Sequence, residues 1–461
     1  MSNELHFPET LTPTTIDSFP IAIVGAGPIG LAAAAHLAQR GLRFVIIEAG
    51  AEAGHSVTQW QHVQLFSPWR YCIDSTVAAL LSESKSGWTA PDADHFPTGA
   101  ELITEYLRPL AAHPSIHPHL RTHTCVRTIT RAGRDKLAGY DREHTPFVLH
   151  LAHADGSESR MLARAIIDAS GTWSSPNPLG ADGTPAMGER AASANIHYGI
   201  PDMLHSERST YAGARVLVVG SGHSAFQAVL DLEQLMHEAP GTRAEWAVRR
   251  TDFGRMFGGG IADQLPGRGE LGTRADQLLR RGAVPLHRRA HIISITQNKK
   301  GALHVHTEDE RELGPFDRII AATGFRPNLD MLRELRLDLD DRCEAPRALA
   351  PLIDPNLHSC GSVPPHGADE LQHTAEPGFF TVGMKSYGRA PTFLMLTGYE
   401  QVRSVAAALA GDWQAARDVR LVLPETGVCC APDDSQACCA PTGLVSFGDI
   451  PITTETTTQA S

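Results

Sequence analysis

The sequence predicts an α/β fold with two Rossmann-like dinucleotide-binding domains, the second inserted into the first. Two glycine-rich turns carry this prediction, GAGPIG at 25–30 and GSGHSA at 220–225. Each turn follows a short apolar run and opens a helical stretch, which is the order of strand, turn and helix that binds a pyrophosphate. One chain is therefore expected to bind two dinucleotides.

The first unit begins with a strand expected over Ile21–Val24, continues in a helix over Leu31–Gln39 and returns in a strand over Phe44–Ile47. Its three glycines allow the tight bend, the close approach of a pyrophosphate and the packing of helix on strand. Glu48 follows the second strand, eighteen residues after the last glycine, where a carboxylate can hold ribose hydroxyls. This pattern favours FAD. The residues of this unit expected to bind it are Gly25, Gly27, Pro28, Gly30 and Glu48.

The second unit repeats the pattern with a strand over Val216–Val219, a helix over Phe226–Glu233 and a following strand over Glu245–Val248. That strand runs into two arginines, and arginine suits the 2′-phosphate of NADPH. The alternative is that the two arginines form a solvated strand end. The residues expected to bind NADPH are Gly220, Gly222, His223, Ser224, Ala225, Arg249 and Arg250.

The remaining segments predict how the domains are connected. Apolar runs at 165–171 and 318–324 end in glycine, and Phe379–Gly383 is expected to be a strand that returns to the first domain. We therefore expect the NADPH domain to be inserted into the FAD domain, which would make the FAD domain discontinuous. The predicted divisions are a flexible N-terminus at 1–18, FAD-domain parts at 19–189 and 321–423, an NADPH-binding domain at 190–320 and a flexible Cys-rich tail at 424–461.

Composition limits the partners and the compartment. The 461 residues carry a formal net charge of −12, which disfavours nucleic acid or an anionic membrane as the main partner. The first residues lack a basic and an apolar region of the kind found in secretory signals, and no apolar run is long enough to span a bilayer. We expect a cytoplasmic protein that acts on a small-molecule substrate, and we allow for a homodimer.

Four motifs together carry a family resemblance. The two glycine turns, ASGTWSSPNP at 169–178 and ATGFRPN at 322–328 resemble those of flavin-containing monooxygenases. The resemblance covers about residues 20–420. It implies that Gly171 lies near FAD and Gly324 near the domain junction, and that Trp60 and the run LFSPW at 65–69 lead towards the flavin ring.

Further motifs are similar to flavoproteins of bacterial arsenic-resistance operons, namely SPWRY at 67–71, MKSYGRAPTF at 384–393 and LPETGVCC at 423–430. Two patterns of related families are absent. The stretch HYGIPDM at 197–203 does not match the FxGxxxH signature of the monooxygenases, and Gly383 is followed by Met384 and Lys385 where many disulfide reductases have aspartate.

Catalytic residues are not identified by a motif, so only candidates for the walls of a substrate pocket emerge. All of these candidates lie in the SPWRY and MKSYGRAPTF runs. The alternative is that the aromatic side chains among them only pack the interior of the FAD domain. Cys360 is a separate candidate, since His358 and His366 could favour its thiolate. The pocket candidates are Trp69, Arg70, Tyr71, Tyr387, Arg389 and Thr392.

The tail contains two vicinal cysteine pairs, Cys429–Cys430 and Cys438–Cys439. Clustered soft thiolates suit thiophilic ions such as trivalent arsenic, mercury, Cu(I) or zinc. The alternative is a disordered tail in which these thiols have no specific role. Cys429, Cys430, Cys438 and Cys439 are the only predicted metal or metalloid ligands.

Three functions follow as hypotheses. In the first, NADPH reduces FAD and the enzyme oxygenates a sulfur or arsenic centre, as the resemblance to monooxygenases implies. In the second, a reductase passes electrons from FAD to thiols or to a metalloid held by the tail. In the third, the chain is a metalloid-binding redox sensor without catalysis.

Overall fold

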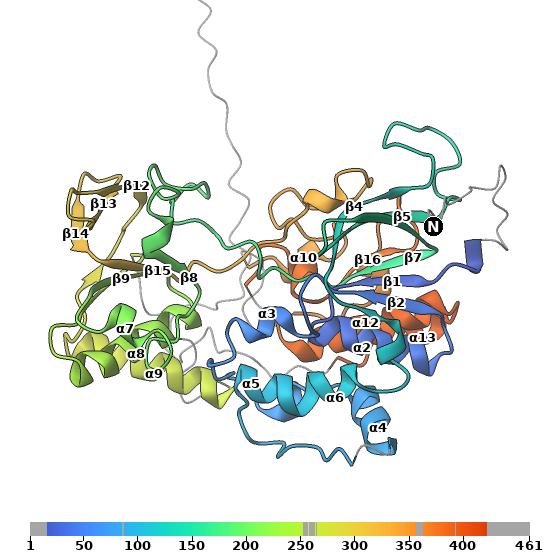
Figure 1. The fold of residues 1–461 in the computed structure, drawn as a ribbon, viewed down its shortest axis with the longest axis horizontal. Helices are drawn as coiled ribbons and strands as arrows, with labels where there is room; N and C mark the ends of the chain where they lie inside the picture. The colour runs from blue at the N-terminus through green and yellow to red at the C-terminus, as the bar shows by residue number, and fades with distance from the viewer. Residues whose placement is uncertain are drawn as a thin grey trace, which may run out of the picture.

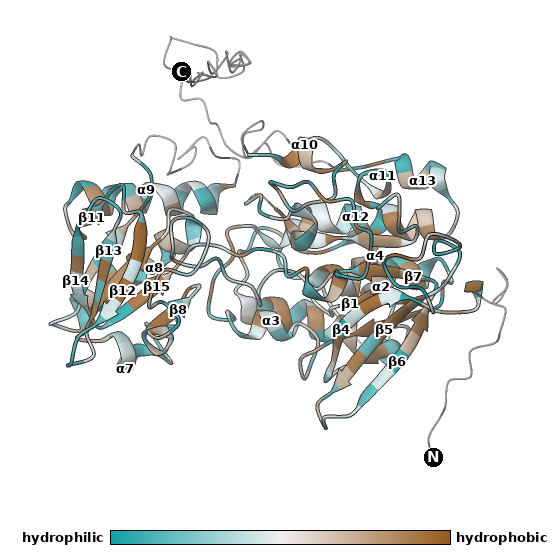
Figure 2. Ribbon diagram, turned by 90° about the horizontal axis from the view of Figure 1, so that it is seen from above, coloured by the Kyte–Doolittle hydropathy of each residue, from teal (hydrophilic) through white to brown (hydrophobic). Residues whose placement is uncertain are grey.

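The computed structural model describes residues 16–84, 87–251, 257, 263, 265–355, 363–391 and 393–421. Two lobes stand side by side in both views, joined by extended segments (Figures 1 and 2). Each lobe contains one parallel five-stranded sheet and one antiparallel three-stranded sheet. The predicted α/β class with two Rossmann-like units is confirmed.

The parallel sheet of the first lobe has the strand order β16-β7-β1-β2-β3. All residues of its three central strands are buried, as expected for a parallel sheet covered on both faces. Strand β7 pairs with β1 on one side and with β16, from late in the chain, on the other, so the sheet combines distant segments. The bounds are β1 Ile21–Val24, β2 Phe44–Ile47, β3 Leu120–Arg121, β7 Ala165–Asp168 and β16 Phe379–Thr381.

Helix α2, Pro28–Gln39, directly follows the first glycine turn and packs against α12, Met395–Leu409. We predicted that it starts at Leu31, and it starts three residues earlier because Pro28 is suited to the first turn of a helix. The other helices of this lobe are α3 His55–Thr58, η1 Trp69–Tyr71, α4 Ser75–Glu83, α5 Gly99–Glu101, η2 Leu102–Leu107, α6 Arg108–Ala111, η3 His117–His119, η6 Asp330–Leu332, α10 Ala350–Ile353, α11 Ala368–Leu371, η7 Gly383–Tyr387 and α13 Trp413–Arg417.

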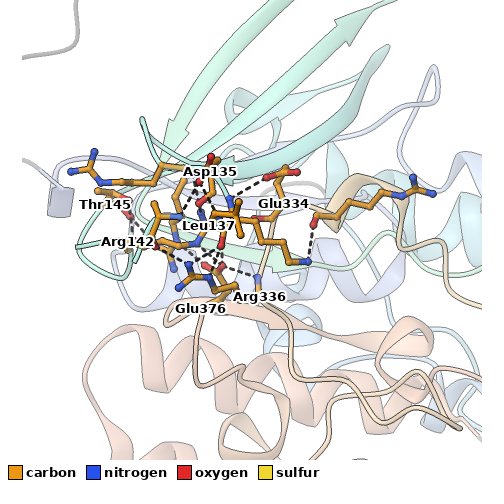
Figure 3. A network of polar contacts seen from close by, with 12 residues as sticks. Asp135, Leu137, Arg142, Thr145, Glu334, Arg336 and Glu376 are labelled. Carbon is orange, nitrogen blue, oxygen red and sulfur yellow. Dashed lines mark hydrogen bonds and ion pairs between the residues drawn. The ribbon is translucent and has the colours of Figure 1, made fainter. Parts of the chain in front are cut away.

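An antiparallel sheet packs against the face of the parallel sheet opposite helix α2. Its strands are β4 Thr124–Arg131, β5 Phe147–His153 and β6 Glu158–Ala163. The buried carboxylate of Glu376 ties this sheet to the chain that enters β16. One of its oxygens accepts from Arg131 Nε at 2.8 Å. The other accepts from Arg142 Nη2 at 3.0 Å and from the Arg336 N–H at 2.8 Å (Figure 3). The three side chains of these ion pairs are at most 2% exposed, so loss of one partner leaves a buried charge unpaired.

The second lobe contains the parallel sheet β11-β10-β9-β15-β8 and the antiparallel sheet β12-β13-β14. Helix α8, His223–Glu238, is longer at both ends than the predicted Phe226–Glu233 and starts immediately after Gly222. Strand β10, Arg243–Ala247, starts two residues before the predicted strand. The other elements are β8 Ile196–Tyr198, β9 Arg215–Val219, β11 Leu286–His287, β12 Ile292–Gln297, β13 Leu303–Thr307, β14 Glu312–Phe316, β15 Arg318–Ala321, α7 Arg208–Tyr211, α9 Pro266–Arg280 and η4 Ser193–Asn195.

The two segments that cross between the lobes are hydrogen-bonded to each other. The Asn177 N–H donates to Gly324 O at 2.9 Å, and the Thr323 hydroxyl donates to Asn177 O at 2.6 Å. Next to this contact, the rings of Trp173 and Phe325 lie 4.7 Å apart. The lobes are therefore joined by a paired double connection. Among the described helices, none has the length and hydrophobicity required to cross a membrane.

Candidate functional site

The first glycine turn requires glycine at two positions for steric reasons and leaves the third open. Gly25 has φ of +99°, and a Cβ there would lie 2.7 Å from Ala169 O. A Cβ on Gly30 would lie 2.0 Å from Gly25 O, whereas a Cβ on Gly27 would meet nothing within 4 Å. Space therefore remains beside the backbone of Gly27 at the N-terminus of α2, where a pyrophosphate is expected.

Glu48 closes this turn from the end of β2. Its Oε2 accepts from the Ala26 N–H and its Oε1 accepts from the Gly50 N–H, each at 2.7 Å. The side chain is half-buried, and within the described residues the bonds to its carboxylate come from backbone groups. Since each carboxylate oxygen can accept a further bond, ribose hydroxyls can donate to it.

The second turn has the same backbone with a different third residue. Gly220 has φ of +141°, and a Cβ there would lie 2.2 Å from Ala322 O, while a Cβ on Gly222 would be in open space. Ala225 takes the place of the third glycine and is fully buried, so this turn tolerates a methyl group. Ser224 at the start of α8 is exposed and its hydroxyl is accessible to a ligand.

Arg249 and Arg250 follow β10 and are both exposed. Arg249 Nη1 donates to Ala181 O at 3.2 Å, so part of its guanidinium is already bonded. Among the described residues, Arg250 has no side-chain partner. These two side chains lie at the end of the strand next to β9, which is where the 2′-phosphate prediction requires them.

A pocket of about 330 Å³ lies where the second turn faces the first lobe. The first lobe contributes mainly apolar side chains to it, and the second lobe contributes the start of α8 and part of α9. Phe66 meets His223 across the pocket, with ring centroids 5.4 Å apart. The lining residues are Val63, Gln64, Leu65, Phe66, Phe96, Ile200, His223, Ser224, Gln227, Pro266, Gly267, Glu270, Leu271 and Arg274.

His223 is the polar residue of this pocket with an unpaired buried atom, because its Nε2 has no partner among the described residues. Burial lowers the pKa of His223 to about 4, and the nearby Arg268 adds to this decrease. The imidazole is therefore neutral at physiological pH. It can donate or accept one hydrogen bond to a ligand without carrying charge.

Of the predicted pocket candidates near 67–71, only Trp69 is enclosed. Trp69 is 1% exposed, and its indole Nε1 is buried without an acceptor among the described residues. Arg70 is exposed, forms an ion pair with Asp94 and lies over the Tyr71 ring. Trp69 thus offers an unsatisfied donor, while Arg70 already has a partner.

The candidate side chains at 387 and 389 also contact other side chains of the protein. Tyr387 is 1% exposed and packs against Phe393 with centroids 5.2 Å apart, and burial raises its pKa above the usual range. Arg389 donates to both oxygens of Glu344, at 2.8 and 3.0 Å. These contacts agree with the packing alternative. Cys360, Thr392 and the four tail cysteines lie outside the described residues.

A buried ion pair that the sequence did not indicate lies at the same edge of the first sheet. Lys385 Nζ lies 2.7 Å from Asp168 Oδ2 and donates to Ser170 Oγ at 3.0 Å. Both side chains of the pair are at most 1% exposed. Asp168 ends β7, and Lys385 follows β16 in the segment where related reductases have aspartate.

The model of the family described as pyridine nucleotide-disulphide oxidoreductase matches residues 22–348, which is more than half of the chain. The chain belongs to this family. It is an FAD- and pyridine-nucleotide-dependent oxidoreductase, so the predicted enzyme class and cofactors are confirmed at this level.

Similar proteins within this family differ in their named activities. The chain is 26% identical over 326 residues to a ferredoxin–NADP reductase of Nocardioides sp., covering 70% of this chain and 78% of that protein. It is 30% identical over 226 residues to the indole-3-pyruvate monooxygenase YUCCA8 of Oryza sativa, covering 49% of this chain and 47% of that protein. The fold is similar to that of the bacillithiol disulfide reductase Bdr from Bacillus cereus, with a TM-score of 0.62, 19% identity and coverage of 85% and 99%.

The residues at the first turn fit the FAD that this family uses. Gly27 leaves open space, Glu48 offers acceptors for ribose hydroxyls, and Trp69 has an unpaired indole donor. The resemblance also placed Gly171 near FAD. It follows Asp168 at the same sheet edge, has φ of +68°, and has open space around a Cβ position.

The domain junction contains the other two residues named by the resemblance. Gly324 has φ of +83° and its carbonyl takes part in the paired crossover. Trp60 packs against Trp173 from the crossover, with centroids 6.5 Å apart. Trp60 is therefore at the junction of the lobes. Its contact with a flavin stays a prediction, as do the other cofactor contacts.

Proposed function

We propose that this protein is an NADPH-oxidising monooxygenase that inserts one oxygen atom into a soft sulfur or arsenic centre. The observation that carries the proposal is the placement of two nucleotide turns in lobes that share one pocket. The second turn reaches this pocket through His223 and Ser224, and the first lobe reaches it through the run at 63–66. We expect the nicotinamide to enter from the second turn and to meet there a flavin held by the first lobe, so that hydride passes between them.

Oxygen is the proposed electron acceptor because the described residues offer no dithiol. Cys72, Cys125 and Cys343 are free in this part of the chain. Burial raises the pKa of Cys72 to about 12, which leaves it protonated and unreactive. The named activity of the rice relative supports oxygenation as chemistry within reach of this architecture.

The reaction balances with O2 as a substrate. A sulfide or a trivalent arsenic compound gains one oxygen atom, the other oxygen atom leaves as water, and NADPH with one proton supplies the two electrons and hydrogens needed. FAD, when bound, mediates between the two-electron donor and O2. The chain's part is to hold both nucleotides and to keep water from the pocket, for which Phe66, Phe96 and Leu65 provide apolar walls.

The test is the stoichiometry of turnover. The holoprotein is reduced anaerobically with NADPH and then mixed with O2 in the presence of a dialkyl sulfide or phenylarsine oxide. The proposal expects one NADPH and one O2 consumed for each oxygenated product, with ¹⁸O from O2 found in that product. Release of hydrogen peroxide without product from every such substrate would contradict it.

A reductase remains the second candidate, because the sequence places four cysteines in the tail. In this case electrons pass from the reduced flavin to a disulfide, which becomes two thiols, and O2 is not required. Replacement of all four tail cysteines by serine should then abolish turnover and leave flavin reduction by NADPH intact. A monooxygenase would keep most of its activity towards small sulfides. We do not retain the non-catalytic sensor, since the family and the named relatives are oxidoreductases.

A further inference from the structure

The ends of β10 and β11 form a basic edge that extends beyond the predicted arginine pair. These strands are parallel neighbours, with Trp246 opposite Leu286 and Ala247 opposite His287. The pairing continues past the strands, because the Val248 N–H donates to His287 O at 2.9 Å. The chain after β11 therefore runs beside the chain after β10.

This continuation brings a second arginine pair next to the first. The Ala290 N–H donates to Val248 O at 3.0 Å, and the Arg289 N–H lies 3.5 Å from Arg250 O. Arg289 and its neighbour Arg288 are exposed, as are Arg249 and Arg250. Four arginines from two strand ends thus meet at one edge of the sheet.

The turn that carries Arg289 is held in place by the protein. Arg311 Nη2 donates to the carbonyls of Arg288 at 2.9 Å and Arg289 at 3.0 Å, and its Nε donates to Asp309 at 2.8 Å. Arg289 has φ of +54°, in the left-handed region that non-glycine residues rarely adopt. A fixed backbone reduces the entropy lost when the side chain binds a ligand.

The carboxylates near this edge lie against side chains other than Arg250 and Arg289. The nearby carboxylates already have partners: Asp309 pairs with Arg311, Glu308 with His291 at 3.3 Å and Glu245 with His287 at 2.6 Å. Within the described residues, Arg250 and Arg289 have no carboxylate or carbonyl bonded to their guanidinium groups. These two exposed guanidinium groups, carried by adjacent backbone segments, therefore have no bonded acceptor in the described part of the chain.

We propose that Arg289 is a specificity-determining residue that binds the 2′-phosphate of NADPH together with Arg250. The inference rests on the proposed use of NADPH. A phosphate monoester carries nearly two negative charges and three acceptor oxygens, more than one guanidinium in an exposed site can satisfy. The order of the strand ends fits, since β9 carries the glycine turn, β10 is its neighbour and β11 follows.

The experiment measures binding to the FAD holoprotein and does not depend on turnover. Adenosine 2′,5′-bisphosphate and adenosine 5′-monophosphate are titrated by calorimetry into the wild type, Arg250→Gln, Arg289→Gln and the double variant. Arg127→Gln is the control, because Arg127 is also exposed and lies in β4 of the other lobe. Each single variant should bind the bisphosphate roughly tenfold more weakly, with little change for the monophosphate. The wild type should also lose this affinity more steeply with salt than either variant.

The outcomes separate the inference from the function on which it rests. If Arg289→Gln binds the bisphosphate like the wild type while Arg250→Gln does not, Arg289 lies outside the site and NADPH use stands. Loss of both probes to the same extent in Arg289→Gln would mean a general effect and would also overturn the inference. If none of the variants discriminates between the probes, the assignment of NADPH fails as well.

Discussion

The two glycine turns share a backbone but differ in their surroundings. At the first turn, Gly30 faces Gly25 O so closely that no side chain fits, and Glu48 is bonded to two backbone N–H groups. At the second turn, Ala225 fills the third position and the charged residues are exposed arginines. The first site is closely packed and half-buried, whereas the second accommodates a methyl group and has exposed charges beside it.

This difference corresponds to what each cofactor has to do. A flavin that stays bound through many turnovers is best held by a preformed site with few exposed charges. A nicotinamide nucleotide must enter and leave in each cycle, and long-range attraction by exposed arginines speeds its arrival. We infer that the first lobe retains FAD and the second lobe exchanges its nucleotide.

The largest effect should come from exchanging the third turn residue. Gly30→Ala places a Cβ 2.0 Å from Gly25 O, so the backbone of the turn must shift. We expect the free energy of unfolding to fall by roughly 3 kcal/mol or more and the protein to lose FAD. The matched change Ala225→Gly should cost about 1 kcal/mol and keep FAD. Denaturant unfolding and flavin content measure both. Equal effects would remove the proposed contrast between the turns.

The buried ion pair of the first lobe provides the next comparison. Lys385→Met leaves Asp168 buried without its cation, which should cost about 3 kcal/mol and reduce FAD retention without abolishing FAD binding. In the second lobe, Arg215 pairs with Asp317, and both side chains are at least 40% exposed. Arg215→Gln should therefore cost at most about 1 kcal/mol. If Lys385→Met unfolds at the same denaturant concentration as the wild type, the pair does not stabilise the flavin site.

Acid should act on the second lobe through His223. Its pKa in the folded chain is about 4 because of burial, below the ordinary value of 6.5, so the unfolded chain binds more protons between these values. Neutral, buried His223 therefore contributes to the free energy of unfolding, and this contribution is complete above pH 6.5. It is lost as the pH falls towards 4, which lowers the free energy of unfolding by roughly 2–3 kcal/mol. His223→Phe should flatten this part of the stability profile. An unchanged profile would mean that His223 is accessible to protons in the folded state.

The smallest expected effect concerns the two arginines after β10. Arg249 already donates to Ala181 O, whereas Arg250 has no side-chain partner among the described residues. Arg250→Gln should raise the KM for NADPH roughly tenfold, and Arg249→Gln only about threefold, with little change for NADH. Steady-state kinetics with both nucleotides measure these ratios. Equal changes for NADPH and NADH in both variants would remove the 2′-phosphate assignment.

Local sequence predicted the strand, turn and helix units well, because glycine at 25, 30 and 220 is required by positive φ or by contact with a carbonyl. The helix starts were predicted too late, since Pro28 and His223 are compatible with a first helical turn. The Asp168–Lys385 pair joins residues more than two hundred positions apart. No local pattern could reveal it.

The second arginine pair and the contacts of Glu376 also could not be predicted from local sequence, because they join segments that are distant in the chain. Arg289 lies beside Arg250 only because β11 pairs with β10, and its tight turn depends on Arg311 from another strand connection. Glu376 binds two arginines from the β4–β5 region. Conversely, the sequence suggested that Arg70 and Arg389 line a substrate pocket, but in the structure both form ion pairs with nearby carboxylates.

The division between a retained and an exchanging nucleotide can be tested directly on the purified protein. The holoprotein is incubated with NADPH under anaerobic conditions, passed through a desalting column, and assayed for both nucleotides while the flavin spectrum is recorded. We expect one FAD per chain after the column, complete bleaching of the flavin by NADPH, and loss of the nicotinamide nucleotide. Retention of the nicotinamide nucleotide with loss of FAD, or an oxidised flavin despite excess NADPH, would contradict it.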